Sequence, residues 1–290
     1  MIYDVRQETI YHYDSPVAYG HHVLRLTPID RRHQRVHAAA LDIVPKPIER
    51  REGKDFFGNR ITWIAFDQPH DTLTVRVAAR IAVEPAAPVS DSPPWEEVRA
   101  AAFASSDPSP HAPPHYLFPS RQVSLDPEIR DYVALSFPPG RPVVEGATDL
   151  MNRIKTEFVY ELGATTASTT PPMSFALRRG VCQDFTHIMI SGMRSLGLPV
   201  AYVSGYLRTV QRAEETRLEG ADAMHAWALV WCGEAAGWIG FDPTNAILAG
   251  ADHVVLAIGR DYADVAPIDG VIFASGAQRL ETSVHVVPVG

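Results

Sequence analysis

Apolar and polar residues alternate along much of the first 84 residues, which is the period of a β-strand with one buried face. A turn at Gly58–Asn59 leads into a further predicted strand. Short strands separated by turn residues predict an N-terminal antiparallel β-sandwich domain over residues 1–84. The alternation is clearest near the end of this region, where one parity is apolar at Leu73, Val75, Val77, Ala79, Ile81 and Val83.

The alternation stops at about residue 85, where proline, alanine and serine become frequent. This composition disfavours regular strand pairing and is typical of a linker on the protein surface. We therefore expect a proline-rich linker over residues 85–125. One short helix is predicted within it, in "PPWEEVRAAAFA", because prolines precede its first turn and glutamates lie near its positive end.

Helical and strand patterns follow one another in the rest of the chain. Apolar residues recur at helical spacing in "DPEIRDYVALS" and "VVEGATDLMNRIKTEF", whereas "PVAYVSGYLRTV", "AMHAWALVWC" and "GWIGFDPTN" have strand composition. Helices that precede strands predict an α+β domain, which we place at residues 126–290. The closing "LETSVHVVPVG" alternates and predicts a last strand, without indicating which sheet takes it.

One buried helix in this region begins with a cysteine. In "GVCQDFTHIMISGMRSLGLP" apolar residues recur at helical spacing, and Gly197 and Pro199 end the helix. Cys182 lies in its first turn, where unpaired N–H groups and the positive dipole end favour a thiolate. The chain has only two cysteines, which excludes a disulfide framework. Cys182 is therefore either a catalytic thiol or a small core residue.

A cysteine nucleophile needs a base, and the base needs an orienting acceptor. His187 is near in sequence, but five residues rotate it about 140° around the helix from Cys182. His225 lies in the predicted strand "MHAWALVW", and Asp242 ends a second predicted strand in "GWIGFDPTN". Adjacent antiparallel strands would set this carboxylate beside the imidazole and hold its tautomer. Each residue alone has an ordinary structural explanation, but their joint occurrence favours a catalytic site.

These segments resemble the core of the bacterial transglutaminase-like superfamily, with the chain order Cys, His, Asp. The resemblance rests on "GVCQDFTHIMISGMRSLGLPVAYVSGY", "MHAWALVW" and "GWIGFDPTNA". It extends to "IYHYDSPV", "LRLTP" and "DFFGNRITW" in a β-rich N-terminal domain, and to "VVLAIGRDYADVAPIDG" after the aspartate. It implies a papain-like core, in which a helix carrying the cysteine packs on an antiparallel sheet carrying the histidine and the aspartate.

The resemblance implies a role for each member of this triad. Cys182 becomes the nucleophile, His225 the general base and then acid, and Asp242 the orienting carboxylate. The backbone N–H of Cys182 is the first candidate donor to the oxyanion, and Tyr160 and the Gln183 side chain are candidates for the second.

Further residues in the resembling segments are candidates for shaping the cleft. Asp184 faces away from the cysteine on the helix and is expected to have a structural hydrogen-bonding role. Arg260 and Asp261 are expected to pair, either at the cleft rim or as a plain surface ion pair. The full set of candidates is Asp184, Tyr206, Trp227, Arg260, Asp261 and Tyr262.

The triad implies attack on an amide bond of a peptide or protein substrate, with a thioester intermediate. If water releases the acyl group from the cysteine, the protein is a peptidase or amidase. If an amine releases it, the protein is a transglutaminase. We expect hydrolysis, with acyl transfer as the alternative. A non-catalytic binding or scaffold protein on the same fold is a second alternative, because function depends on the site and not on the fold.

Composition and charge limit the classes of binding partner that we expect. The chain has 290 residues and a formal net charge of −8, so it has no basic surface for nucleic acid. It contains no His-Glu-x-x-His motif and no EF-hand-like loop, and we expect no metal and no cofactor. Charged residues interrupt the apolar run that a signal peptide would need, so we expect a cytoplasmic protein without a membrane partner. The oligomeric state is left open.

Overall fold

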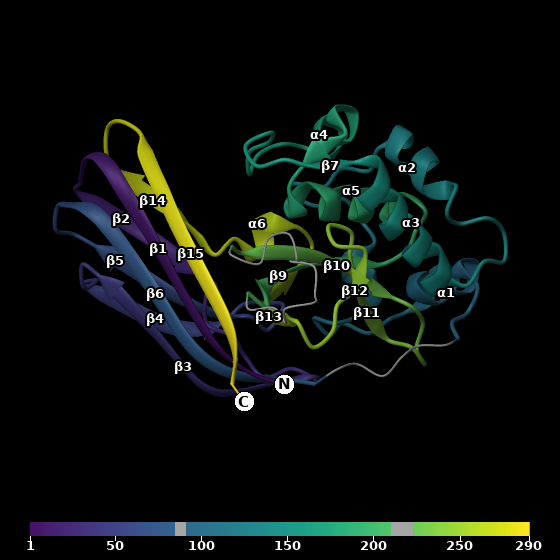
Figure 1. Cartoon of the computed structure of the whole chain (residues 1–290), viewed down its shortest axis with the longest axis horizontal. Coiled ribbons are helices and arrows are strands. Elements are labelled where there is room, and N and C mark those ends of the chain that lie inside the picture. Colours follow the sequence, from purple (N-terminus) through teal and green to yellow (C-terminus); the bar gives the residue numbers. More distant parts are fainter. Residues whose placement is uncertain (85–90, 210–222, 290) are drawn as a thin grey trace.

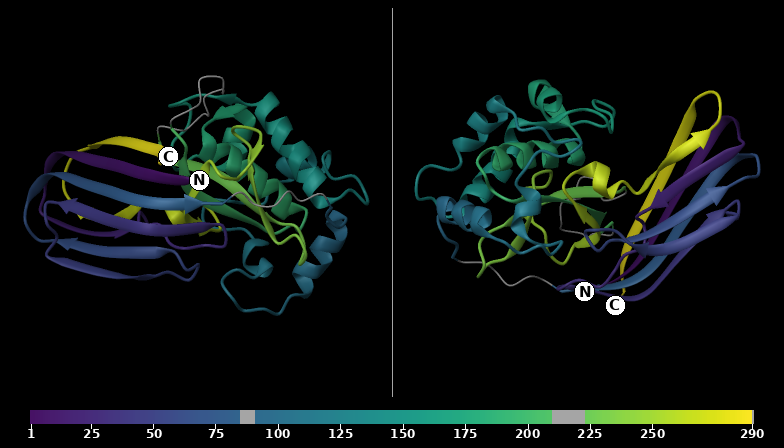
Figure 2. Two further views of the ribbon diagram at one scale, coloured as in Figure 1. Left: turned by 60° about the horizontal axis from the view of Figure 1, so that its bottom comes forward. Right: turned by 180° about the vertical axis from the view of Figure 1, so that it is seen from behind.

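The computed structural model describes residues 1–84, 91–209 and 223–289 and contains both helices and strands. Figure 1 shows two parts. The part made of long strands, here called the β-domain, comprises residues 1–84 and 268–289. The part in which helices pack on a sheet, here called the core domain, lies between these two segments in the sequence. Figure 2 shows the same separation from two further directions, with the two chain ends close together.

Two four-stranded antiparallel sheets form the β-domain. In order across the first sheet, the strands are β15 (Gln278–Val289), β1 (Ile2–Val17), β6 (His70–Val83) and β3 (Gln34–Val44). In order across the second sheet, they are β14 (Ile268–Phe273), β2 (Tyr19–Leu24), β5 (Arg60–Phe66) and β4 (Glu49–Lys54). Apolar side chains from both sheets are buried in one cluster, as the alternation in the sequence predicts. The cluster includes Tyr3, Val5, Leu24, Ile64, Val75, Val77 and Val284.

The last two strands belong to the β-domain although they follow the core domain in the sequence. β15 pairs with β1 from Ile2↔Val289 to Tyr13↔Gln278, and β14 pairs with β2. The grouping of residues 126–290 into one core is therefore corrected, and the sheet that takes the C-terminal strand is identified. The physical reason is that β1 would otherwise be a long edge strand with unpaired N–H and C=O groups.

The core domain contains a five-stranded antiparallel sheet. In order, its strands are β12 (Ile247–Leu248), β11 (Trp238–Asp242), β10 (His225–Trp231), β9 (Val200–Leu207) and β13 (His253–Gly259). The helices are α1 (Trp95–Ala104), α2 (Pro127–Ala134), α3 (Val143–Glu157), α4 (Pro171–Leu177), α5 (Cys182–Ser195) and α6 (Tyr262–Val265), with a 3-10 turn η1 (Pro113–Tyr116). Two short strands, β7 (Val159–Tyr160) and β8 (Arg179–Gly180), pair in parallel. In the described ranges, each helix is too short or too polar to cross a lipid bilayer.

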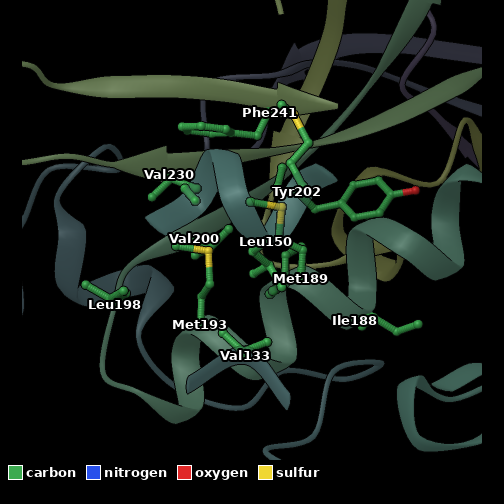
Figure 3. Close-up of a cluster of buried hydrophobic side chains, with 14 of the residues drawn as sticks. Val133, Leu150, Ile188, Met189, Met193, Leu198, Val200, Tyr202, Val230 and Phe241 are labelled. Atoms are coloured by element: carbon green, nitrogen blue, oxygen red, sulfur yellow. The ribbon is translucent and has the colours of Figure 1, made fainter. Parts of the chain in front are cut away.

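Helix α5 packs on this sheet through apolar side chains that recur every three or four residues. Figure 3 shows Met189 and Met193 of α5 in one cluster with Val200 and Tyr202 of β9 and Val230 of β10. These side chains are buried, and each of the larger aliphatic ones contributes about 1.5–3 kcal/mol to folding. The cluster therefore fixes the helix that begins with the cysteine against the strands that carry the other candidate residues.

The described part of the predicted linker, residues 91–125, packs on the core domain. Val98 of α1 is buried in the same cluster as α5, together with Leu117 and Val123. Arg194 of α5 is also buried and donates hydrogen bonds of 3.1 Å to a carbonyl and a hydroxyl of this segment. The expected surface linker is therefore a packed segment that includes the predicted helix, because scattered apolar residues between prolines are enough to anchor it.

Two side-chain amides of the β-domain bind the edge strand β13 of the core sheet. Gln34 accepts a hydrogen bond from the Val255 N–H and donates one to the Val255 carbonyl, both at 2.8 Å. Asn59 makes the same two contacts with Ile258, at 2.8 and 2.7 Å. The amides satisfy backbone groups that an edge strand leaves unpaired. Leu256 lies between these contacts and is buried in the β-domain cluster, so both domains hold β13.

Candidate active site

Cys182 is the first residue of α5 and is partly exposed. The turn before it is held by Asp184, whose carboxylate accepts hydrogen bonds from the Val181 N–H at 2.8 Å and the Thr165 hydroxyl at 2.6 Å. Burial raises the pKa of Asp184. A Cβ added at Gly180 would lie 2.6 Å from the same carboxylate, so the close approach requires glycine. Asp184 is thus part of the helix start and does not form a cleft wall.

The second cysteine has different surroundings. Cys232 follows β10 and is fully buried in the apolar cluster beneath α5. Burial raises the pKa of its thiol. Both cysteines are free thiols, and Cys182 is the one that solvent can reach. A water-soluble reagent therefore has access to the Cys182 thiol and not to the buried Cys232 thiol.

His225 at the start of β10 and Asp242 at the end of β11 form a buried pair. His225 Nε2 lies 2.9 Å from Asp242 Oδ2, and neither side chain is accessible to solvent. The two strands are antiparallel neighbours, which brings the two residues together. An ionised carboxylate only accepts hydrogen bonds, so Nε2 carries the proton of a neutral imidazole. His225 Nδ1 is buried and has no hydrogen-bond partner among the described residues, so it is available for a further proton.

The charges in the site favour the imidazolium form of His225. Burial alone would lower the pKa of His225, but Asp242 and the Cys182 thiolate raise it well above the value of free imidazole. Burial alone would raise the pKa of Asp242, but His225 and His253 bring it well below its usual range. Asp242 and Cys182 thus change the pKa of His225 in the same direction.

Two residues that sequence analysis missed complete the surroundings of Asp242. His253 Nε2 lies 3.3 Å from Asp242 Oδ2, and the Asn245 side chain donates to the same oxygen at 2.8 Å. The backbone N–H groups of Thr244 and Asn245 donate to Oδ1 at 2.9 and 3.2 Å. The turn sequence "DPTN" is a signal for the contact with the Thr244 N–H, because Asp commonly bonds the backbone two residues on. His253 has no local signal, because β13 reaches the site only by pairing with β9.

Trp227 lies behind the histidines. Its ring stacks on His225 with centroids 6.2 Å apart and meets the edge of His253 at 5.0 Å. A Cβ added at Gly205 on the neighbouring strand would lie 2.5 Å from this ring, so glycine leaves the space that the indole fills. The side chain is only 1% exposed, so the predicted place of Trp227 in a cleft wall is corrected to a buried support for two histidines.

Tyr206 is also placed differently from the prediction. Its side chain is fully buried in the cluster of the β-domain, and its hydroxyl donates to Gln7 Oε1 at 2.5 Å. Tyr206 therefore does not shape the cleft, and its place among the cleft-shaping candidates is corrected. The reason is that the β-domain covers the part of β9 where Tyr206 lies, which sequence spacing does not reveal.

The predicted pair of Arg260 and Asp261 is not formed. Arg260 instead makes a bidentate contact with Asp264, at 2.8 and 3.0 Å. Asp261 is buried and accepts a 2.9 Å hydrogen bond from a backbone N–H at the start of α6. Tyr262 is partly buried, and its backbone N–H donates to His187 Nε2 at 3.2 Å. α6 begins after Asp261, and Asp264 in its first turn reaches back to Arg260, whose backbone N–H also donates to Asp264 Oδ2 at 2.9 Å.

The candidate oxyanion donors surround the start of α5. The backbone N–H of Cys182 belongs to the first residue of the helix. Gln183 donates from its side chain to the Ala167 carbonyl at 3.1 Å, which directs this amide toward the loop before α4. Tyr160 in β7 is paired with Gly180 in β8, two residues before the cysteine. All three candidates thus lie within the segments that form the entrance to the helix.

In the part of the chain that the structure describes, one group of three side chains could hold a metal ion. The ligand atoms of His225, Asp242 and His253 lie within 4.8 Å of one another. Two imidazoles and a carboxylate suit several divalent metals. However, two imidazole nitrogens and the Asn245 amide already converge on one carboxylate oxygen at 2.8–3.3 Å. The geometry is therefore that of a hydrogen-bonded network.

A helix that begins with a partly exposed cysteine, packed on a sheet that carries a buried His–Asp pair, defines a cysteine-type catalytic fold. Residues 3–82 match the family described as "Bacterial transglutaminase-like N-terminal region". Residues 135–243 match the family described as "Transglutaminase-like superfamily". The chain belongs to the transglutaminase-like superfamily, which confirms the resemblance found in the sequence.

Relatives extend over nearly the whole chain. The uncharacterized protein Rv2569c of Mycobacterium tuberculosis is 37% identical over 295 residues, which cover 99% of this chain and 92% of that protein. The uncharacterized protein ML0607 of Mycobacterium leprae is 29% identical over 283 residues, 97% of each chain. The crystal structure of a "Putative Cysteine Protease" from Cytophaga hutchinsonii superposes with a TM-score of 0.76 at 21% identity, covering 100% of this chain and 92% of that one. The predicted α+β fold is thereby confirmed.

Proposed function

We propose that the protein attacks amide bonds of peptides or proteins with Cys182, aided by His225 as base and Asp242 as orienting carboxylate. The observation that carries the proposal is the 2.9 Å contact between His225 Nε2 and Asp242 Oδ2. This pair is buried, and Cys182 lies close enough for its thiolate to raise the pKa of His225. The cysteine-type catalytic fold of the family supports the same reaction class.

The residues act in a fixed order in this mechanism. Asp242 holds the Nε2 proton of His225, and Nδ1 takes the proton of the Cys182 thiol. The thiolate adds to the amide carbonyl, whose oxygen takes the electron pair and accepts hydrogen bonds from the Cys182 N–H and from Tyr160 or Gln183. When the tetrahedral intermediate collapses, the C–N bond breaks and Nδ1–H protonates the departing amine. A thioester on Cys182 remains.

We propose water as the second nucleophile. His225 takes a proton from water, the hydroxide adds to the thioester, and the thiolate leaves as the carboxylic acid product forms. Water reaches the partly exposed Cys182 and needs no binding site of its own, which supports hydrolysis. Transfer to an amine is the alternative and follows the same steps with the amine in place of water. Two unpaired cysteines suit a reducing compartment, and we propose the cytoplasm.

One experiment separates these reactions. The protein is incubated with a diverse peptide library, with and without a small primary amine, and product masses are compared with those of the Cys182→Ser variant. Cleaved peptides or released ammonia in the wild type alone are the expected result. Amine adducts as the main product would replace hydrolysis by acyl transfer. A library without any Cys182-dependent product would favour a binding or scaffold protein on this fold.

A further inference from the structure

One carboxylate oxygen of Asp242 lies within hydrogen-bond distance of three side-chain donors. His225 Nε2 is 2.9 Å away, Asn245 Nδ2 is 2.8 Å away and His253 Nε2 is 3.3 Å away. A triad requires only the first of these contacts. The side chains of Asp242 and His253 are 0% and 3% exposed, so water does not take the place of the second imidazole.

The backbone determines which nitrogen of His253 carries a proton. The Gly250 N–H donates to His253 Nδ1 at 3.3 Å, so Nδ1 must have a free lone pair. The single proton of the neutral imidazole therefore lies on Nε2, the nitrogen that faces Asp242. His253 thus donates a hydrogen bond to the carboxylate through Nε2 and accepts one through Nδ1.

Contacts with a neighbouring ring and with both sides of its strand hold the ring of His253 in position. Its edge packs on Trp227, whose other contact is the stacked ring of His225. The strand that it begins, β13, pairs with β9 on one side. On the other side, Gln34 of the β-domain makes two hydrogen bonds of 2.8 Å with Val255, two residues further on. Both domains therefore hold the donor in place.

We propose that His253 is a positioning residue that holds the Asp242 carboxylate toward His225, a role that rests on the proposed function of Cys182, His225 and Asp242. With Asn245 and His253 bound to Oδ2 and two backbone N–H groups bound to Oδ1, the carboxylate has no free rotation about its terminal bond. Burial alone would raise the pKa of Asp242, but its contacts with His225 and His253 keep it well below its usual range, so the carboxylate stays an acceptor. His225 Nε2 then stays on Asp242, which leaves Nδ1 as the nitrogen that takes the Cys182 proton in the proposed function.

Two substitutions separate the hydrogen bond of His253 from its ring. His253→Phe keeps an aromatic ring against Trp227 and removes the donor, whereas His253→Gln keeps an N–H near the position of Nε2 and removes the ring. His22→Phe is the matched control, because His22 is a buried histidine of the β-domain that packs near Phe66. The measurement is the rate of Cys182 alkylation by iodoacetamide, mapped by mass spectrometry over about pH 5 to 9.

We expect His253→Phe to slow the alkylation of Cys182 at neutral pH about tenfold, the lower end of what a hydrogen bond to a charged group is worth. His253→Gln should keep most of the wild-type rate, and His22→Phe all of it. Wild-type rates in folded His253→Phe would overturn the proposal. Equal slowing in His253→Phe and His253→Gln would also overturn it, because an N–H donor at this position would then not restore the rate.

A spectroscopic measurement on the wild type needs no variant to fold. Imidazole nitrogen shifts from NMR should show His253 with its proton on Nε2 and a bare Nδ1, and a proton on Nδ1 would contradict the proposed donor. Failure of the underlying function gives a different result. If His225→Ala alkylates as fast as the wild type, Cys182 is not activated at all, and the function is overturned whatever His253 does.

Discussion

The two faces of the core sheet carry different chemistry, although one strand supplies both. Ala226, Ala228 and Val230 of β10 face the apolar cluster beneath α5. His225 and Trp227 of the same strand stack on each other on the opposite face, in contact with the polar network. Successive side chains of a strand point to opposite faces, so a seven-residue strand serves both purposes. In β10, the residues that stabilise the fold therefore alternate with the residues of the candidate site.

The apolar face gains free energy from burial, whereas the polar face only avoids a loss. Burying Asp242 and two histidines costs several kcal/mol unless each group has partners. The network supplies these partners, since the carboxylate accepts hydrogen bonds from three side chains and two backbone N–H groups. Substitutions on the polar face should therefore change reactivity most, and substitutions on the apolar face should change stability most. Four predictions test this division.

The largest effect is expected for Asp242→Asn. The amide keeps the shape of the carboxylate but offers an N–H where an acceptor is needed, so His225 takes the wrong tautomer. Cys182-dependent turnover should fall by a factor of about 10³–10⁴, and His225→Ala should lower it at least as far. Turnover is measured on the peptide products, with near-UV circular dichroism as the control for folding. Full activity in folded Asp242→Asn would show that the orienting group lies elsewhere.

Next in size is a cavity on the apolar face. Met193 is fully buried in the apolar cluster that also contains Val200 and Val230, and Met193→Ala should lower the free energy of unfolding by about 2–5 kcal/mol. The alkylation rate of Cys182 in the folded fraction should not change. Met173→Ala on α4 is the matched control, because Met173 is 58% exposed and its loss should cost less than about 0.5 kcal/mol. Urea unfolding measures both, and similar values for the two variants would contradict the division.

The two cysteines provide a third test, because Cys182 lies at the helix start and Cys232 lies inside the apolar cluster. Burial raises the pKa of the Cys232 thiol, so little of it is ionised at neutral pH. Iodoacetamide should label Cys182 about 100-fold faster than Cys232 in the folded protein. Peptide mapping by mass spectrometry gives both rates. Equal labelling of the folded protein would remove the case for an activated thiol.

The smallest effect is a difference in pH dependence between two buried histidines. The pKa of His225 is raised in the folded state, so its contribution to stability is complete below about pH 6.5 and is lost as the pH rises through the folded value. Burial lowers the pKa of His187 to about 4. The unfolded chain binds that proton more tightly, so protonation at His187 reduces stability as the pH falls from about 6.5 to 4.

Variants reveal these opposite slopes. The stability difference between the wild type and His225→Gln should shrink as the pH rises above about 6.5, by up to about 1.4 kcal/mol per pH unit. For His187→Gln, the wild type should instead lose stability relative to the variant as the pH falls below about 6.5. Urea unfolding over this pH range checks both differences. Parallel slopes for the two variants would show that the polar network does not hold a proton on His225.

Much of the architecture follows from local patterns in the sequence. The alternation in residues 73–84 predicts a strand, and β6 spans His70–Val83. The helical spacing after Gly180 predicts α5, which begins at Cys182. The family motifs also place His225 and Asp242 on neighbouring strands, and the structure brings their side chains to 2.9 Å. These features depend on the period of a helix or strand and on short sequence motifs, so they can be predicted from the sequence without knowing the tertiary structure.

Tertiary structure alone decided the remaining features, because they depend on contacts between distant segments. β15 returns to β1, Tyr206 is buried under the β-domain, and His253 reaches Asp242 through the pairing of β13 with β9. Arg260 pairs with Asp264 rather than with its neighbour Asp261 because a helical turn follows. Periodicity in a sequence indicates which face of an element is apolar, but it does not indicate which element will cover that face. The sequence by itself therefore determined the elements and the residue types of the candidate site, and the packing of the two domains decided what surrounds them.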